Sequence, residues 1–330
     1  MWFVDVADND FITSAKLQCE IPSGGIGLIG VATLGNDVFV ARRNAKIDVY
    51  DVVTSTLRQS MSLSGFVYES DDGYEEYYPQ CMAACDFHKC FYFSCQSSCR
   101  SAFVLKASLS RNTDSVGSFE SHLAVTTWST KAHNVYDNVY CVSVNKNHNV
   151  LVASVNTYEG LPVVQEYTTD GVVVQQVNLP PDITHIRQVI QLPNGFYGVI
   201  HQGQCRHYSV VDSTRHVVKC LEAEAAFNVK SNDTGRPNRA RSGRKGQMQL
   251  KLSTPVGLTV TRSGTVFIAD HNSNKILVVR DSGSTLTAEW LPDTVCGTLS
   301  KVSCVYFDDA KNRLYIGEEG GRVLCCGMQL

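Results

Sequence analysis

The chain has 330 residues, of which 43% are hydrophobic and 18% charged, and its formal net charge at pH 7 is −3. A chain of this length can bury roughly three quarters of its unfolded surface, so it needs no disulfide or metal to fold. The composition excludes intrinsic disorder and long coiled coils, both of which carry far more charge. The small net charge also argues against a chain-wide surface for polyanions.

The N-terminal residues Met1 to Asp5 have no basic start, no apolar core segment and no small-residue cleavage site, so we expect no signal peptide. No stretch of the sequence reaches the ~18 apolar residues of a membrane helix. From these two features we expect a soluble, cytoplasmic protein that does not contact membranes.

Short β-rich runs separated by Gly, Asn, Asp and Ser turns follow one another along the chain, which is typical of an all-β fold. One unit recurs, with an apolar run, a polar turn and a second apolar run. Its copies lie at residues 37–51, 149–171, 265–281 and 312–326, with looser copies at 90–107 and 195–212. A further apolar run precedes each clear copy and another follows most of them, so the unit has four strands in ~40–60 residues, the size of a propeller blade.

Six such units can be counted, and they predict a single six-bladed β-propeller domain covering residues 1–330. The expected blades span about residues 25–65, 80–128, 138–181, 184–222, 250–293 and 299–330. The last unit lacks a fourth strand before Leu330. Residues 14–21, which precede the first complete blade, have the pattern of a fourth strand. We therefore expect this N-terminal strand to complete the last blade and close the ring.

Residues 254–279 resemble an NHL repeat. Pro255 and Gly257-Leu258 open the inner strand, and Ala269-Asp270 leads through an Asn-rich turn to Lys275-Ile276. Asp and Asn suit such turns because their side chains bond the local backbone. This repeat is similar to those in the C-terminal propellers of tripartite-motif (TRIM-NHL) proteins. The resemblance implies recognition of a protein or of RNA. The chain has no paired-cysteine zinc module and no coiled-coil segment, so we expect an adaptor or an isolated propeller rather than a ubiquitin ligase.

Two inserts of opposite charge connect blades in this scheme. The first, at 65–80, is acidic and rich in tyrosine, and its candidate binding residues are Tyr68, Glu69, Asp71, Asp72, Tyr74, Glu75, Glu76, Tyr77 and Tyr78. The second, at 228–246, is basic, and its candidate residues are Lys230, Arg236, Arg239, Arg241, Arg244 and Lys245. Three blades separate the inserts, so we expect them on one face, opposite each other across the ring.

The inserts have two interpretations. They are either solvated loops without a partner or the two halves of a bipolar binding surface. In the second case the basic insert binds an acidic peptide or phosphate, and the acidic insert binds a basic partner. Single-stranded RNA is an alternative ligand for the basic insert, although 228–246 has no aromatic residue on which a base could stack.

The run from Cys81 to Cys99, with His88 inside it, could hold a metal, but its spacing is near-uniform. Structural zinc sites instead show two close pairs separated by a spacer, so we favour thiols packed in strands. Cys95, Cys141 and Cys304 also lie where a strand needs a small buried residue. His201 and His207 flank one turn, and we expect them at the surface.

No motif of a known catalytic site occurs in the sequence. The six expected inner strands are mostly apolar, with Asp86, Asn145 and Asp308 near their ends. We therefore predict no catalytic residue, metal or cofactor. The expected function is a monomeric, non-catalytic interaction propeller that binds a protein partner through the face carrying the inserts. A metal-dependent channel hydrolase similar to lactonases is a further alternative.

Overall fold

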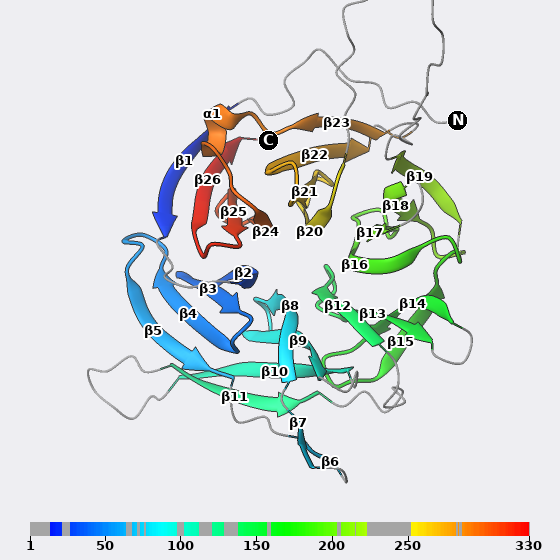
Figure 1. Cartoon of the computed structure of the whole chain (residues 1–330), viewed down its shortest axis with the longest axis horizontal. Helices are drawn as coiled ribbons and strands as arrows, with labels where there is room; N and C mark the ends of the chain where they lie inside the picture. Colours follow the sequence, from blue (N-terminus) through cyan, green and yellow to red (C-terminus); the bar gives the residue numbers. More distant parts are fainter. Residues whose placement is uncertain are drawn as a thin grey trace, which may run out of the picture.

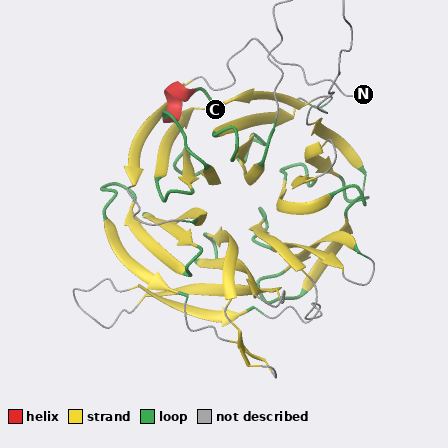
Figure 2. Ribbon diagram, viewed as in Figure 1, coloured by secondary structure: helices red, strands yellow, loops and turns green. Residues whose placement is uncertain are grey.

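The computed structural model describes residues 14–21, 27–63, 68–70, 73–75, 77–97, 102–111, 121–128, 138–156, 160–202, 206–214, 216–222, 252–281, 283 and 286–329. Within these ranges the chain forms six four-stranded antiparallel sheets and one two-stranded ribbon. The six sheets stand radially around a common axis (Figure 1), and almost every ordered element is a strand (Figure 2). The predicted six-bladed β-propeller is confirmed.

Each of the first five blades is built from one continuous part of the chain. Its first strand lies nearest the axis, and each following strand lies farther out. The strands of blade 1 are β2 (Leu28–Leu34), β3 (Asp37–Arg42), β4 (Lys46–Asp51) and β5 (Leu57–Ser62). Those of blade 2 are β8 (Tyr77–Cys85), β9 (Cys90–Ser97), β10 (Ala102–Arg111) and β11 (Ser121–Thr127). Blade 3 contains β12 (Asn138–Val144), β13 (Val150–Asn156), β14 (Leu161–Tyr167) and β15 (Val173–Asn178). Blade 4 contains β16 (Thr184–Gln191), β17 (Tyr197–Gln202), β18 (Arg206–Val211) and β19 (Val217–Glu222). Blade 5 contains β20 (Pro255–Val260), β21 (Val266–Asp270), β22 (Lys275–Asp281) and β23 (Leu286–Trp290).

The sixth blade is assembled from both ends of the chain. Its three C-terminal strands are β24 (Val302–Asp308), β25 (Arg313–Glu318) and β26 (Val323–Gln329), and β1 (Ser14–Ile21) is its outermost strand. β1 runs antiparallel to β26, in a register from Ser14 opposite Gln329 to Ile21 opposite Val323. The predicted closure of the ring is therefore confirmed, and β1 occupies the backbone edge that β26 would otherwise expose.

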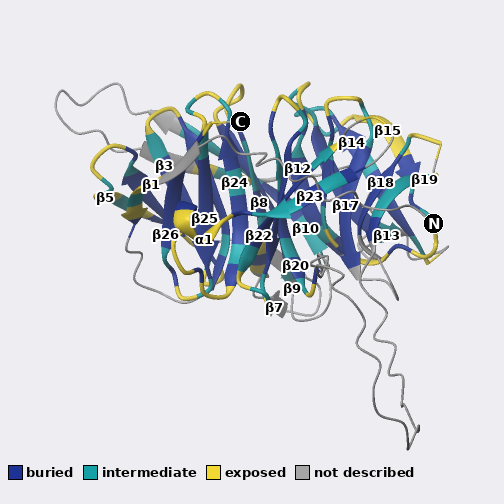
Figure 3. Cartoon of the chain, turned by 90° about the horizontal axis from the view of Figure 1, so that it is seen from above, coloured by how far each residue is buried: buried dark blue, intermediate teal, exposed yellow. Residues whose placement is uncertain are grey.

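The interior of the ring consists of apolar side chains packed between neighbouring sheets. The middle strands are apolar on both faces because each face meets another blade, and every residue of β21 is buried. The outermost strands are more exposed, and Val173 to Gln176 of β15 face solvent. Seen edge-on, the disc has buried strands inside and exposed turns on its two faces (Figure 3).

A β-bulge recurs in every blade between the first and second strands, and the residue after it packs against the next blade. This position is held by Gly30, Cys81, Cys141, Gln188, Gly257 and Cys304. A Cβ on Gly30 would lie 2.8 Å from the Cβ of Met82 in blade 2. Five of these six residues are Gly or Cys, which explains three of the cysteines by packing alone, whereas the Gln188 Oε1 of blade 4 accepts a hydrogen bond from the Leu258 N–H of blade 5.

Two elements were not anticipated from the sequence. The short helix α1 (Asp293–Cys296) follows blade 5 and packs on β1 and β26. A small ribbon of β6 (Tyr68–Ser70) and β7 (Gly73–Glu75) projects from the ring beside blade 2 (Figure 1). In the described part of the chain, no helix has the length and apolar character needed to cross a bilayer.

Candidate functional site

The inner strands of the six blades surround a central channel of about 940 Å³. Hydroxyl and amide side chains line much of its wall, among them Gln80, Ser143, Gln191, Thr259 and Ser303. All six inner strands begin at one face of the disc, here called the top face, and end in tight turns at the bottom face. The channel therefore has two chemically distinct ends.

At the top face, one structurally equivalent residue of each second strand is polar or small and buried. These residues, each opposite the start of the bulge, are Arg42, Cys95, Ser154, His201, Asp270 and Glu318. The Asp270 carboxylate accepts hydrogen bonds from the backbone N–H groups of Ser253 (2.6 Å) and Thr254 (2.8 Å). Such contacts fasten the incoming connection to its blade, which is a structural role.

Glu318 and Arg42 satisfy their buried charges in a similar way. The Glu318 carboxylate accepts a hydrogen bond from the Ser300 N–H at 2.7 Å and pairs with the Arg322 guanidinium at 2.6 Å. The Arg42 Nε donates to the Asp48 carboxylate at 2.7 Å. These charges are compensated inside the protein, so they are not free to bind a ligand.

In four of the six blades, the residue that follows this buried position lines the channel opening. Together with two neighbours at the starts of inner strands, these residues form a polar ring that we call the channel mouth: Arg43, Gln96, Arg187, His271, Lys301 and Glu319. Arg43, Arg187 and Lys301 are exposed, and the other three are partly exposed. The mouth thus carries three permanent cations and one carboxylate.

His271 and Lys301 both lie beside the one carboxylate of the mouth. The His271 Nδ1 is 3.0 Å from the Val302 carbonyl oxygen, which can accept a hydrogen bond but not donate one. Nδ1 therefore carries the proton, and Nε2, 4.0 Å from Glu319, faces the opening. The Lys301 Nζ is 3.5 Å from the same carboxylate. Glu319 is partly neutralised by Lys301, while Arg43 and Arg187 remain exposed on separate blades.

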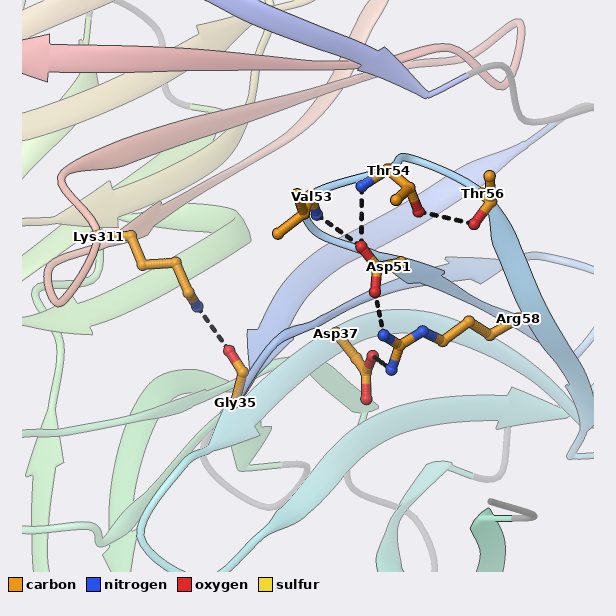
Figure 4. Close-up of polar contacts among 8 residues, drawn as sticks. All are labelled: Gly35, Asp37, Asp51, Val53, Thr54, Thr56, Arg58 and Lys311. Atoms are coloured by element: carbon orange, nitrogen blue, oxygen red, sulfur yellow. Dashed lines mark hydrogen bonds and ion pairs between the residues drawn. The ribbon is translucent and has the colours of Figure 1, made fainter. Parts of the chain in front are cut away.

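The bottom face uses its polar groups to connect blades. The Lys311 Nζ of blade 6 donates to the Gly35 carbonyl oxygen of blade 1 at 2.7 Å (Figure 4). The Arg262 N–H of blade 5 donates to Asp309 of blade 6 at 2.8 Å, and the Lys146 Nζ of blade 3 donates to the Pro193 carbonyl oxygen of blade 4 at 3.0 Å. These contacts hold the ring together, so we assign the bottom face a structural role.

A network on the outer part of blade 1 shows the same local satisfaction of charge (Figure 4). The Asp51 carboxylate accepts hydrogen bonds from the N–H groups of Thr54 and Val53, each at 2.8 Å, and it pairs with Arg58. The hydrogen bonds from Thr54 and Val53 are the main reason that the pKa of Asp51 falls to about 2. Arg58 also pairs with Asp37 at 2.7 Å.

The acidic insert predicted from the sequence is partly described. Tyr68 and Glu69 belong to β6, and Tyr74 and Glu75 belong to β7. Tyr77 and Tyr78 are not insert residues but the first residues of inner strand β8, paired with Ser97 and Gln96. The remaining three candidates, Asp71, Asp72 and Glu76, lie outside the described residues.

All six candidate residues of the basic insert, Lys230, Arg236, Arg239, Arg241, Arg244 and Lys245, lie outside the described residues. The flanking strands are described: β19 ends at Glu222 and β20 begins at Pro255. The seam between blades 4 and 5 lies across the ring from the seam between blades 1 and 2, and the ribbon of β6 and β7 projects beyond the outer strands of blade 2 (Figure 1).

The cysteines and histidines form no recognisable metal site in the described part of the chain, where no group of three or more His, Cys, Asp or Glu side chains could hold an ion. Cys95, Cys141 and Cys304 are buried, as predicted. Burial raises the pKa of Cys95 to about 12, so this thiol is protonated at neutral pH. The expectation that His201 lies at the surface is wrong: it is fully buried, with Nε2 2.9 Å from the Ser209 Oγ.

The channel mouth itself was not predicted from the sequence. Its signal is present in the repeat, because Arg43, His271 and Glu319 each follow by two positions a small residue that ends the apolar part of the second strand. In the sequence these residues were interpreted as part of polar turns, because a turn and a channel opening both favour polar side chains.

Comparison with known proteins supports the architecture. No protein-family model matches the chain, and no curated protein sequence matches it. The WD40 β-propeller domain of Doa1 is 10% identical with a TM-score of 0.50, over 95% of this chain and 97% of that one. A protein of unknown function from Bacteroides caccae is 12% identical with a TM-score of 0.49, over 88% of this chain and 81% of that one. A chain of a mitotic checkpoint complex is 10% identical with a TM-score of 0.47, over 90% of this chain and 75% of that one. At such low identity the similarity to the Doa1 domain concerns the fold alone: the chain is a six-bladed β-propeller.

Proposed function

We propose that this protein is a non-catalytic interaction propeller that binds an acidic segment of a protein partner at the channel mouth. The observation that carries the proposal is the charge of the mouth. Arg43, Arg187 and Lys301 are exposed there, and Glu319 is the one carboxylate among the six residues of the mouth. A ring of cations over a polar channel attracts carboxylates and orients an extended peptide that carries them.

The rigidity of the ring supports this proposal. Arg43, His271 and Glu319 directly follow strands that are buried on both faces, so binding at these residues costs little ordering of the protein. At the bottom face Lys311, Arg262 and Lys146 are engaged in contacts between blades, so we favour the top face as the surface for recognition. Binding residues on the loops of a rigid scaffold are a common arrangement.

The charged inserts and the resemblance to NHL repeats extend the proposal. In this scheme the ribbon of β6 and β7, which contains Glu69 and Glu75, receives a basic part of the partner. The basic residues 228–246 supply further cations for the acidic part of the partner. The resemblance of residues 254–279 to the NHL repeats of TRIM-NHL propellers is consistent with a domain whose task is recognition.

The proposal can be tested with labelled peptides of matched length that are rich in Glu, in Lys or in neither. We expect the Glu-rich peptide to bind the wild-type protein best and to bind the double variant Arg43→Glu/Arg187→Glu at least about tenfold more weakly. Lys89→Glu is the matched control, because it reverses an exposed charge in the turn between β8 and β9 at the bottom face, at a residue that does not line the channel. Its affinity should stay within about twofold of the wild type.

Equal binding of the Glu-rich peptide by the wild type and the double variant would overturn the proposal. A preference for the Lys-rich peptide, or no binding of any peptide, would do the same. Labelled single-stranded RNA tests the alternative ligand. Binding that weakens steeply with salt and is lost on deletion of 228–246 would favour RNA recognition instead.

A further inference from the structure

Three pairs of cysteines lie side by side in the described residues, and none of the six forms a disulfide. Cys19 of β1 is the cross-strand partner of Cys325 in β26, and Cys85 of β8 is that of Cys90 in β9. The third pair joins Cys296 of α1 to Cys326 of β26. In each pair one thiol hydrogen-bonds the other.

The pair in the closing blade differs from the other two in access. Cys19 is partly exposed, whereas both members of each of the other pairs are buried. Direct partners in antiparallel strands have Cα atoms about 4.5–5.5 Å apart, inside the range of about 4.4–6.8 Å found for disulfides. Cys19 and Cys325 therefore combine disulfide-compatible geometry with a route for a small reagent.

We propose that Cys19 and Cys325 are a redox modification site: they form a reversible disulfide that fastens the N-terminal strand to the C-terminal strand. The oxidant is a low-molecular-weight disulfide. This inference is independent of the proposed binding function, since it concerns the outer part of blade 6 and not the channel mouth.

The chemistry follows from the surroundings of the two thiols. The hydrogen bond from Cys325 is the largest cause that lowers the pKa of Cys19, to about 6, against the opposing effect of burial, and the Arg313 guanidinium adds to the lowering. Cys19 is thus mostly thiolate at neutral pH and is the nucleophile. Its sulfur attacks the small disulfide, forming a mixed disulfide and releasing one small thiolate. Cys325 then loses its proton and attacks the Cys19 sulfur, which releases the second small thiol. Two protein thiols are oxidised and one small disulfide is reduced to two thiols.

The consequence for stability is large because of where the bond lies. A disulfide between Cys19 and Cys325 closes a loop of nearly the whole chain, while one between Cys85 and Cys90 closes a single tight turn. The longer the loop, the more a disulfide restricts the unfolded chain. We therefore expect oxidation of the first pair to raise Tm by about 5 °C, since a chain of this size gains a few degrees per such cross-link.

The experiment treats the reduced full-length protein with oxidised glutathione, blocks free thiols and maps the peptides by mass spectrometry. We expect a cross-linked peptide that joins Cys19 to Cys325, and a rise in Tm that dithiothreitol reverses. Cys19→Ser should lose both. Cys220→Ser is the matched control, because Cys220 is also partly exposed but has Ser209 as its strand partner, and it should keep both.

Three results would overturn the inference. One is a mixed disulfide that stays on Cys19 without forming the cross-link. Another is a cross-link that forms without a rise in Tm. The third is a rise in Tm that Cys19→Ser retains. Since the mapping is done on the wild-type protein, the inference can be judged even if a serine variant fails to fold.

Discussion

Blade 2 and blade 6 have the same four-stranded geometry, and each holds a cross-strand pair of cysteines, yet they are assembled differently. Blade 2 is one continuous segment in which β8 and β9 join through a tight turn. Blade 6 needs β1, which arrives from the other end of the chain. The hydrogen bonds of the two sheets are alike, but the entropy lost on pairing grows with the length of chain that is closed. Closure of the ring is therefore the step that most needs reinforcement.

The structure shows this reinforcement around β1. Ile21 is fully buried where β1 meets Val323. The helix α1 packs on both β1 and β26. On the inner side of the same blade, Asp308 accepts a hydrogen bond from the Thr33 Oγ1 of blade 1 at 2.7 Å. Blade 2 has no comparable need, because its strands are neighbours in sequence.

The largest predicted effect comes from removing residues 1–21. Without β1 the edge of β26 is unpaired and the apolar side chains of Val323 and Cys325 lose their cover. We expect Tm to fall by about 10 °C or more, since several kcal/mol of burial and pairing are lost. Thermal unfolding followed by circular dichroism measures this change.

A circular permutant tests whether stability depends on β1 itself or on its distance from β26 along the chain. A short turn links Gln329 to Ser14, which already face each other at the open end of the β1–β26 pair, and the new termini lie between Trp128 and Asn138. We expect this protein to keep the wild-type Tm within a few degrees and to gain little from oxidation, as a turn disulfide does in blade 2. A permutant as unstable as the deletion would contradict the role given to β1.

A smaller effect is predicted at the seam between blades 1 and 2. Gly30→Ala places a Cβ 2.8 Å from the Met82 Cβ, an atom fixed to the backbone, so one of the blades must shift. We expect a loss of about 2 kcal/mol in the free energy of unfolding. Gly320→Ala in blade 6 is the control, because nothing lies within 4 Å of its added Cβ. Urea denaturation should find it no less stable than the wild type, and equal losses for both variants would argue against close packing at the seam.

The architecture could be predicted because every copy of the repeat has the same pattern of buried apolar runs and polar turns. Apolar runs of the second and third strands must be buried on both faces, and the missing fourth strand of the last unit required a partner from elsewhere, which residues 14–21 supplied. The cysteines in strands were interpreted correctly as small buried residues for the same reason, and Cys141 is 1% exposed.

The candidate site could not be predicted in the same way. Arg42 and Arg43 are adjacent and chemically identical, but the first is buried against Asp48 and the second is exposed at the channel mouth. His201 looked like a turn residue and is buried beside Ser209. Whether such a polar residue faces solvent depends on the bulge and on the neighbouring blade, and neither can be inferred from the local sequence.

The smallest predicted effect is a pH-dependent change in stability, compared at equivalent turns of blades 6 and 2. Asp308 begins the turn between β24 and β25, as Asp86 does between β8 and β9. Burial raises the pKa of Asp308, but hydrogen bonds from Lys311 and Thr33 outweigh it and leave the pKa below its ordinary value. The stabilisation from this carboxylate is therefore complete above about pH 4 and is lost as the pH falls through the lower pKa of the folded state.

We expect Asp308→Asn to lose about 1 kcal/mol at pH 7 and to approach the wild type at pH 3. Asp86 is exposed and pairs with exposed Lys89, so Asp86→Asn should stay within about 0.5 kcal/mol of the wild type throughout. Urea midpoints at pH 7, 5 and 3 measure both variants, and an equal pH dependence of the two would contradict the special role of the junction between blades 6 and 1.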